Sequence, residues 1–158
     1  MRHVVRVGFV AAAVAALLGV AVVGSVAQDK EAIIKQRRDT MKHQGDAMKA
    51  IAAYAKGEGD QAAALKGVND LLAINPKIVT LFPAGTSLAE FPGKTGAKPE
   101  IWKDMAKFDS IPPILKGEEE KLLEAIKSGN KEAVGAQAAA TGKNGCGACH
   151  TPFREKLS

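Results

Sequence analysis

The chain is poor in aromatic residues and in cysteine. Phe, Trp and Tyr make up only 4% of its 158 residues, and there are two cysteines and three histidines. No segment alternates apolar and polar side chains as a half-buried strand does. Ser/His/Asp, paired-carboxylate and phosphate-loop arrangements are also missing, so the sequence predicts neither a β-rich fold nor an enzyme.

A strong excess of one charge is missing as well. The formal net charge is +5 at pH 7. Without the first 27 residues, which contain Arg2 and Arg6, 20 basic side chains remain against 17 acidic ones. The lysines are scattered, so we expect no nucleic-acid binding. Weak attraction toward an acidic partner protein is compatible with this charge.

The chemistry is concentrated in five residues near the C-terminus, Cys146-Gly147-Ala148-Cys149-His150. Cys-x-x-Cys-His is the attachment motif of c-type haem. On a helix, residues i, i+3 and i+4 share one face, so both thiols and the imidazole project the same way. The thiols can add to the two vinyl groups of a porphyrin while His150 binds its iron. The motif therefore predicts one covalently bound haem c.

Two other interpretations of these residues stay open. A Cys146–Cys149 disulfide would make the chain a haem-free helical protein, although redox Cys-x-x-Cys pairs usually follow a strand, and a helical segment precedes this one. A structural zinc site would need a fourth ligand. His43 is the only further histidine after residue 27, and there is no third cysteine.

The first residues resemble an export signal. Arg2, His3 and Arg6 precede an apolar run over residues 7–23, and Ser25-Val26-Ala27 offers small side chains to a signal peptidase. We expect cleavage after Ala27. The alternative is an uncleaved anchor, since residues 7–27 are about long enough to span a bilayer.

This interpretation divides the chain into a signal peptide, residues 1–27, and one domain, residues 28–158. Export agrees with the haem motif, because haem c is attached outside the cytoplasm. We therefore expect a periplasmic protein with no stable membrane association after removal of the signal.

Four segments of the domain have apolar side chains at helical spacing. Asp29 is the expected cap of the first, and Pro112-Pro113 predict a kink or restart of the third near Ser110. The expected helices cover residues 29–56, 60–75, 99–127 and 130–156. Mostly short connections between such helices predict an all-α fold, an antiparallel four-helix bundle with a cofactor between its helices.

Three stretches resemble one family. They are the haem motif with Thr151-Pro152-Phe153-Arg154 after it, Arg37-Arg38-Asp39-Thr40-Met41-Lys42 in the first helix, and Pro99-Glu100-Ile101-Trp102. Together they resemble the class II c-type cytochromes, the cytochrome c′ and cytochrome c-556 group, over the whole domain. The resemblance implies a four-helix bundle in which His150 is the proximal iron ligand.

The resemblance also bears on the other side of the iron. Cytochrome c′ has a non-ligating apolar residue there, whereas the c-556 branch has a ligating methionine, and Met41 falls at this position. A Met/His pair favours electron transfer over ligand capture. Met41 could instead be a gap-filling core residue beside an open distal face, and Met48 lies on nearly the same side of the helix. Arg37 resembles the family arginine that reaches the haem propionates, with a solvated surface residue or substitution by Arg38 as alternatives.

These expectations combine into a monohaem cytochrome of the c-556 type. It would carry electrons between redox partner proteins, with His150 and Met41 as axial ligands. The alternative is a five-coordinate protein of the cytochrome c′ type that binds or senses NO or CO. The family resemblance also implies a homodimer through the first two helices, where Ala50, Ala52 and Ala53 would permit close packing.

Overall fold

The computed structural model describes the backbone of residues 18–157 and the side chains of residues 29–157. Its α-helices are α1 (Leu18–Lys56), α2 (Gln61–Ile74), α3 (Glu100–Lys103), α4 (Met105–Asp109), α5 (Ile111–Lys127), α6 (Lys131–Ala140) and α7 (Gly147–Phe153). Two short 3₁₀ turns, η1 (Asn75–Lys77) and η2 (Val79–Leu81), follow α2, and a π-helical segment, η3 (Thr141–Cys146), joins α6 to α7.

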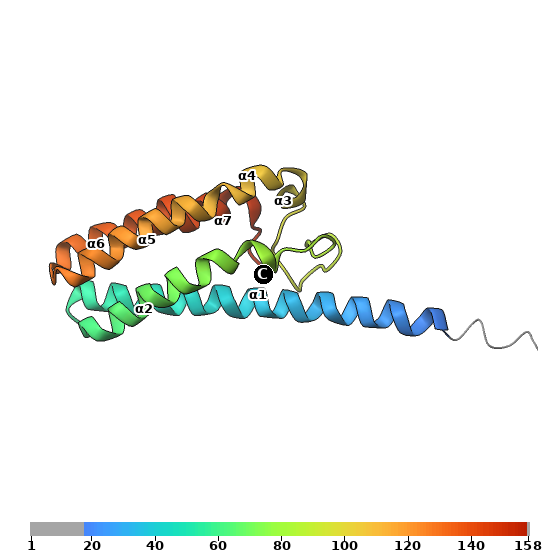
Figure 1. Ribbon diagram of the computed structural model, residues 1–158, viewed down its shortest axis with the longest axis horizontal. Helices are drawn as coiled ribbons and strands as arrows, with labels where there is room; N and C mark the ends of the chain where they lie inside the picture. Colours follow the sequence, from blue (N-terminus) through green and yellow to red (C-terminus); the bar gives the residue numbers. More distant parts are fainter. Residues whose placement is uncertain (1–17, 158) are drawn as a thin grey trace, which may run out of the picture.

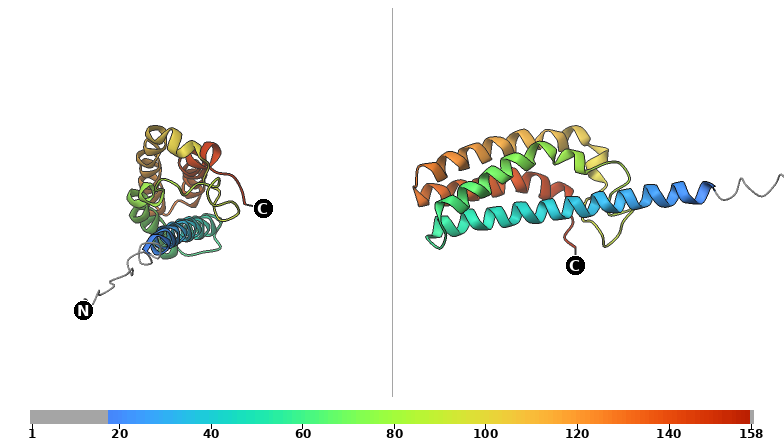
Figure 2. Two further views of the ribbon diagram at one scale, coloured as in Figure 1. Left: turned by 90° about the vertical axis from the view of Figure 1, so that its right-hand side faces the viewer. Right: turned by 60° about the horizontal axis from the view of Figure 1, so that its bottom comes forward.

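These elements form an antiparallel four-helix bundle, as predicted. Helices α1, α2 and α5 and the combined α6–η3–α7 run side by side, with successive members in opposite directions (Figures 1 and 2). No strand is formed between residues 18 and 157, where the only ladder contact is the isolated bridge between Ala97 and Arg154. One core cluster holds the bundle together, with Ala47, Ile51, Tyr54, Ala64, Val68, Leu71, Leu122, Ile126 and Val134 as its buried members.

Helix α1 is longer than the sequence pattern predicts. It begins at Leu18 instead of Asp29, so Asp29 lies inside the helix and the expectation that it caps α1 is wrong. No proline interrupts the chain between Leu18 and Lys56. The N-terminal part of α1 projects beyond the bundle (Figure 1).

The expected signal peptide lies largely outside the described residues, which begin at residue 18. Cleavage after Ala27 therefore stays a prediction. Among the helices of residues 18–157, none combines the length and the apolar composition needed to cross a lipid bilayer.

The third helix of the bundle is broken, as Pro112 and Pro113 predict. Helix α5 restarts after Ser110, and the prolines occupy its first turn, where a missing backbone N–H costs no helical hydrogen bond. A second break at Asp104 separates α3 from α4. Its backbone leaves the helical region, and its carboxylate caps α4 by accepting a hydrogen bond from the Lys107 backbone N–H at 3.1 Å.

The fourth helix differs from the expected continuous helix over residues 130–156. Asn130 caps α6, accepting from the Ala133 N–H at 2.9 Å. The chain then widens into the π-helical η3, and α7 ends at Phe153, after which Arg154 is extended. Gly145 in η3 packs directly against α5, where an added Cβ would collide with Leu115. This close approach brings the haem motif against α5.

Candidate haem-binding site

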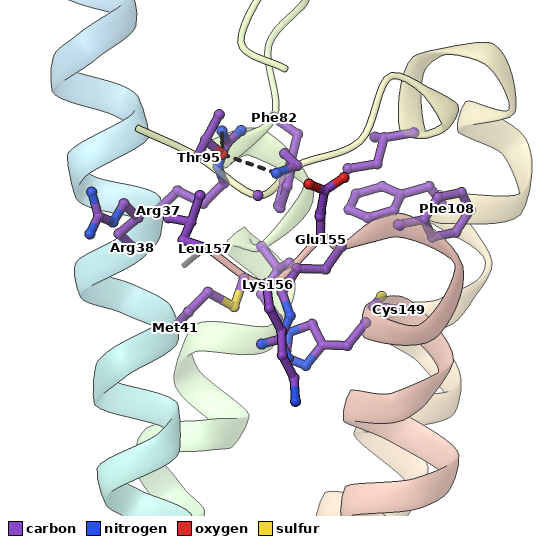
Figure 3. Close-up of a pocket in the computed structure, with 17 residues that line it drawn as sticks. Arg37, Arg38, Met41, Phe82, Thr95, Phe108, Cys149, Glu155, Lys156 and Leu157 are labelled. Carbon is purple, nitrogen blue, oxygen red and sulfur yellow. Dashed lines mark hydrogen bonds between the residues drawn. The ribbon is translucent and has the colours of Figure 1, made fainter. Parts of the chain in front are cut away.

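A cavity of about 490 Å³ lies at the end of the bundle that carries α7 and the long loop after α2 (Figure 3). Cavities of roughly 300–1,000 Å³ hold small molecules and cofactors in proteins. The lining residues are Arg37, Arg38, Met41, Ile78, Phe82, Thr95, Gly96, Ala97, Ile101, Phe108, Cys149, His150, Phe153, Arg154, Glu155, Lys156 and Leu157. The lining residues thus come from helix α1, from residues 78–108 and from the C-terminal residues 149–157.

The haem motif supplies one side. The backbone is helical from Cys146 to His150, which is the arrangement that the motif spacing predicts. Cys149 and His150 line the cavity, whereas Cys146 lies one turn earlier, at the end of η3, and is not among the lining residues. Both cysteines are half-buried, and they form no disulfide with each other.

Burial governs the protonation of these groups. It lowers the pKa of His150, helped by the nearby charge of Arg154, and so favours the neutral imidazole that can bind a metal. Burial, with a smaller effect of Cys146, raises the pKa of Cys149 to about 11. Burial also raises the pKa of Cys146, with a further contribution from the carboxylate of Glu119.

Met41 lies across the cavity from Cys149 (Figure 3). Its thioether points from α1 into the cavity, on the side opposite to the haem motif (Figure 3). Met48 packs against the core cluster of the bundle and does not line the cavity. His43, the remaining zinc-ligand candidate, is exposed and pairs with Asp70 at 3.2 Å.

Arg37 also lines the cavity, but its guanidinium is bound by the protein. Nη1 donates hydrogen bonds to the Leu81 carbonyl oxygen at 3.2 Å and to Thr86 Oγ1 at 3.1 Å. Nη2 donates to the Thr86 carbonyl oxygen and to Thr95 Oγ1, both at 2.8 Å. The guanidinium carbon also lies 4.6 Å from the centre of the Phe82 ring. Arg37 therefore anchors residues 81–95, and its contact with a haem propionate stays a prediction.

Burial lowers the pKa of Arg37 to about 10, which still leaves a cation at neutral pH. Arg38 is more exposed and makes a single hydrogen bond, to the Lys94 carbonyl oxygen at 3.2 Å. It therefore keeps more donors than Arg37 for an anionic group in the cavity.

Aromatic side chains make one side of the cavity apolar. Phe108 packs edge-to-face on Phe82 and Phe153, with ring centres 4.8 and 5.4 Å apart. Trp102 packs on the same cluster, as does Cys149, and the indole N–H of Trp102 donates to the Phe82 carbonyl oxygen at 3.0 Å. Trp102 and Phe153 are thus packing residues beside the cavity.

The segment after α7 is the part of the site that sequence reasoning missed. The backbone N–H of Lys98 donates to the Phe153 carbonyl oxygen at 3.0 Å, and that of Glu155 to the Gly96 carbonyl oxygen at 2.8 Å. These bonds bring Lys156 and Leu157 over the cavity (Figure 3). No motif marks such a contact, because it joins segments nearly sixty residues apart.

The residues present fit a covalent haem c. A neutral histidine and a cysteine from the motif face an apolar cavity, and the second cysteine lies one turn away. Cations at the cavity, Arg38 and Lys156 among them, suit the two carboxylates of a haem. Such a haem would supply an iron atom that exchanges single electrons or binds small ligands.

Comparisons with known proteins agree with this fit. The family model described as "Cytochrome C'" matches residues 32–154. Cytochrome c′ from Rhodopseudomonas palustris is 36% identical, over 92% of this chain and 97% of that protein. Cytochrome c-556 from the same organism is 33% identical, over 84% of this chain and 89% of that protein.

Solved structures give the same result. A cytochrome c′ described as having ligand-controlled dimer dissociation superposes with a TM-score of 0.72 and 28% identity, covering 80% of this chain and 97% of its own. A nitric oxide complex of a variant cytochrome c′ from Alcaligenes xylosoxidans superposes with a TM-score of 0.67 and 25% identity, covering 80% and 97%. Fold, haem motif and relatives therefore agree that this chain belongs to the cytochrome c′ family of class II c-type cytochromes, non-enzymatic proteins that carry covalent haem c.

Proposed function

We propose that this protein holds one haem c through Cys146 and Cys149, with His150 as the proximal ligand, and binds NO or CO at the opposite face of the iron. This was the second of the two functions that the sequence suggests. The relatives favour it, because most are named cytochrome c′ and one solved relative is a nitric oxide complex.

The observation that carries the proposal is the apolar character of the cavity beside Met41. Ile78 and Phe82 line the cavity together with Met41. The polarity and accessibility of the distal pocket decide whether a haem iron binds gases or only transfers electrons. An apolar pocket of this kind suits an uncharged diatomic molecule better than it suits water or an anion.

Electron transfer between redox partner proteins is the second candidate. It is favoured by Met41, whose thioether points into the cavity, and by relatives named cytochrome c-556. With Met41 and His150 as axial ligands, the iron would have no free position for a gas and a raised reduction potential.

We further propose that the protein acts in the periplasm after removal of residues 1–27, and that it pairs with a second copy through α1 and α2. The dimer proposal is supported by the solved relative whose dimer dissociates under ligand control. Ala50, Ala52 and Ala53 on α1 are half-buried small residues that would let a second copy pack closely.

One spectroscopic experiment separates the two functions. Absorption spectra of the haem-loaded protein are recorded oxidised and reduced, before and after carbon monoxide, for the wild type, Met41→Leu and Met48→Leu. If the gas-binding proposal is correct, the wild type is high-spin and shifts with carbon monoxide, and neither substitution is needed for the shift.

A low-spin wild type that ignores carbon monoxide, together with a responsive Met41→Leu variant, would instead establish Met41 as a ligand and electron transfer as the function. Met48→Leu is the control, since Met48 packs in the bundle core and should behave as the wild type does. A colourless protein from a host able to attach haem c would contradict both functions.

A further inference from the structure

A carboxyl group is buried in the interior of the bundle and belongs to no ion pair with the described residues. The side chain of Glu119, on α5, is completely buried, with 0% of its surface exposed. Carboxylates are rarely found in this state without a cationic partner, because burial strongly disfavours the charged form.

The hydrogen bonding of Glu119 is incomplete. Oε2 accepts one hydrogen bond from Asn75 Nδ2 at 3.0 Å, while Oε1 has no partner among the described residues. Asn75 is uncharged and follows α2, so it cannot neutralise the carboxylate. An ionised carboxylate would need more donors than this, whereas a protonated one needs fewer.

The two neighbouring acids of α5 have cationic partners. Glu118 accepts hydrogen bonds from Lys121 Nζ at 3.0 Å and from Gln137 Nε2 at 2.9 Å. Glu120 lies 3.3 Å from Lys116 Nζ in an exposed ion pair. Among Glu118, Glu119 and Glu120, Glu119 is therefore the acid without a cationic partner in the described part of the chain. Packed side chains surround its carboxyl group instead of solvent.

Glu119 lies on the side of the bundle where the haem motif packs. Helix α5 contacts η3, where Thr141 Oγ1 donates to the Glu118 carbonyl oxygen at 3.3 Å and Gly145 packs against Leu115. The charge of Glu119 reaches Cys146, because it contributes to the raised pKa of that thiol. Glu119 does not line the cavity, so it would act on a haem attached at Cys146 through its charge and not by contact.

Glu119 gains or loses its proton near neutral pH. Burial raises the pKa of Glu119 to about 7, against a lowering by the Asn75 hydrogen bond and with a small rise from the charge of Glu120. Its hydrogen-bond partner is the neutral Asn75 amide, and the titratable groups that act on it are the exposed Glu120 of its own helix and Cys146 of η3, which would be an uncharged thioether once a haem is attached. A change of charge nearby would therefore change the fraction of Glu119 that is protonated.

We propose that Glu119 is a proton-binding site coupled to the oxidation state of the haem. Glu119 takes one proton from solvent when an external one-electron donor reduces the iron, and it returns that proton to solvent when the iron is oxidised. The added electron and the added proton cancel, so the charge of the interior stays constant. The inference rests on haem attachment at Cys146 and Cys149 and applies to either proposed function.

The test is a redox titration of the haem-loaded protein at several pH values. The midpoint potential of the wild type should fall as the pH rises through about 7, because the ionised carboxylate favours the oxidised iron. Glu119→Gln keeps the shape of the side chain and the Asn75 contact but cannot ionise, so this fall should be lost. Glu124→Gln is the matched control, since Glu124 is an exposed partner of Lys127 on the same helix and should keep the fall.

A wild type whose potential is independent of pH, or a Glu119→Gln variant that keeps the wild-type fall, would overturn the proposal. Infrared difference spectra of the wild type, reduced minus oxidised near pH 7, provide a second readout that needs no variant. They should show a carboxylic acid C=O band that appears on reduction and shifts in D₂O, and its absence would also overturn the proposal. A protein without haem bands would overturn the proposed function too, whereas the other outcomes concern Glu119 alone.

Discussion

Arg37 is a cation in a position where an uncompensated charge would be strongly unfavourable. Only 3% of its surface is exposed, yet its two terminal nitrogens donate four hydrogen bonds and its guanidinium faces the Phe82 ring. Arginine suits this role because its planar group presents several donors in fixed directions. Arg37 thereby fixes residues 81–95, of which Phe82 and Thr95 line the cavity.

Replacement of Arg37 by lysine should therefore destabilise the protein although the charge is kept. One ammonium group cannot reach acceptors on Leu81, Thr86 and Thr95 together, and we expect a loss of roughly 2–4 kcal/mol in the free energy of unfolding. Urea denaturation of the haem-loaded protein measures this loss. Arg38→Lys is the control, because Arg38 makes one exposed hydrogen bond and should change stability by less than about 0.5 kcal/mol. Equal stability of the two variants would contradict the anchoring role.

Individual residues differ in how far the sequence reveals their positions. The motif spacing places Cys149 and His150, and helical periodicity with the family resemblance places Met41 opposite them. The partners of Arg37 lie more than forty residues away, so no local pattern could identify them. Glu119 resembles its two acidic neighbours in the sequence, and only packing distinguishes it from them.

At the scale of elements, the prolines of α5 occupy the part of a helix that tolerates them. Pro112 and Pro113 lie in the first turn, where they remove no helical hydrogen bond and restrict the unfolded chain. The double change Pro112→Ala and Pro113→Ala should leave the haem spectrum unchanged and lower the free energy of unfolding by no more than about 1 kcal/mol. Absorption spectroscopy and urea denaturation check both expectations.

A second variant, at the contact between η3 and α5, shows whether the haem spectrum responds to the packing of these two elements. Gly145→Ala adds only one methyl group, but that group would collide with the end of the Leu115 side chain, which must move and so disturb the packing between η3 and α5. Its spectrum should therefore differ from that of the wild type. A changed spectrum in the proline variant would mean that α5 also positions the haem motif through its first turn.

Helix boundaries set by turn chemistry could be predicted, and those set by packing could not. Gly129, with φ of 73°, and the Asn130 cap mark the start of α6, and glycine followed by a capping asparagine is a recognisable sequence signal for such a boundary. The π-helical η3 and the early end of α7 have no comparable sequence signal. Gly145 of η3 packs against α5, and the residues at the end of α7 are bonded to residues 96–98.

For the whole molecule, the buried carboxyl predicts a dependence of stability on pH. The pKa of Glu119 rises from an ordinary value of 4.5 to about 7 on folding. Between these values the unfolded chain has lost the proton and the folded protein keeps it, so stability falls as the pH rises. The shift corresponds to a loss on the order of 3 kcal/mol, complete above about pH 7.

Glu119→Gln removes this ionisation and should therefore gain stability, relative to the wild type, as the pH rises from about 4.5 to 8. Urea denaturation at the two pH values measures the difference. A stability difference that is the same at both would show that Glu119 ionises as freely in the folded protein as in the unfolded chain.

The cavity joins residues 37–41 of the chain to residues 149–157. A polypeptide that leaves the ribosome, or crosses a membrane, N-terminus first therefore presents one wall of the cavity long before the other exists. Helices α1 to α6 can already be complete when the haem motif is still missing, so the binding pocket must wait for the last tenth of the chain. A chain that ends before residue 146 would thus contain the α1 side of the cavity but none of the residues of the haem motif.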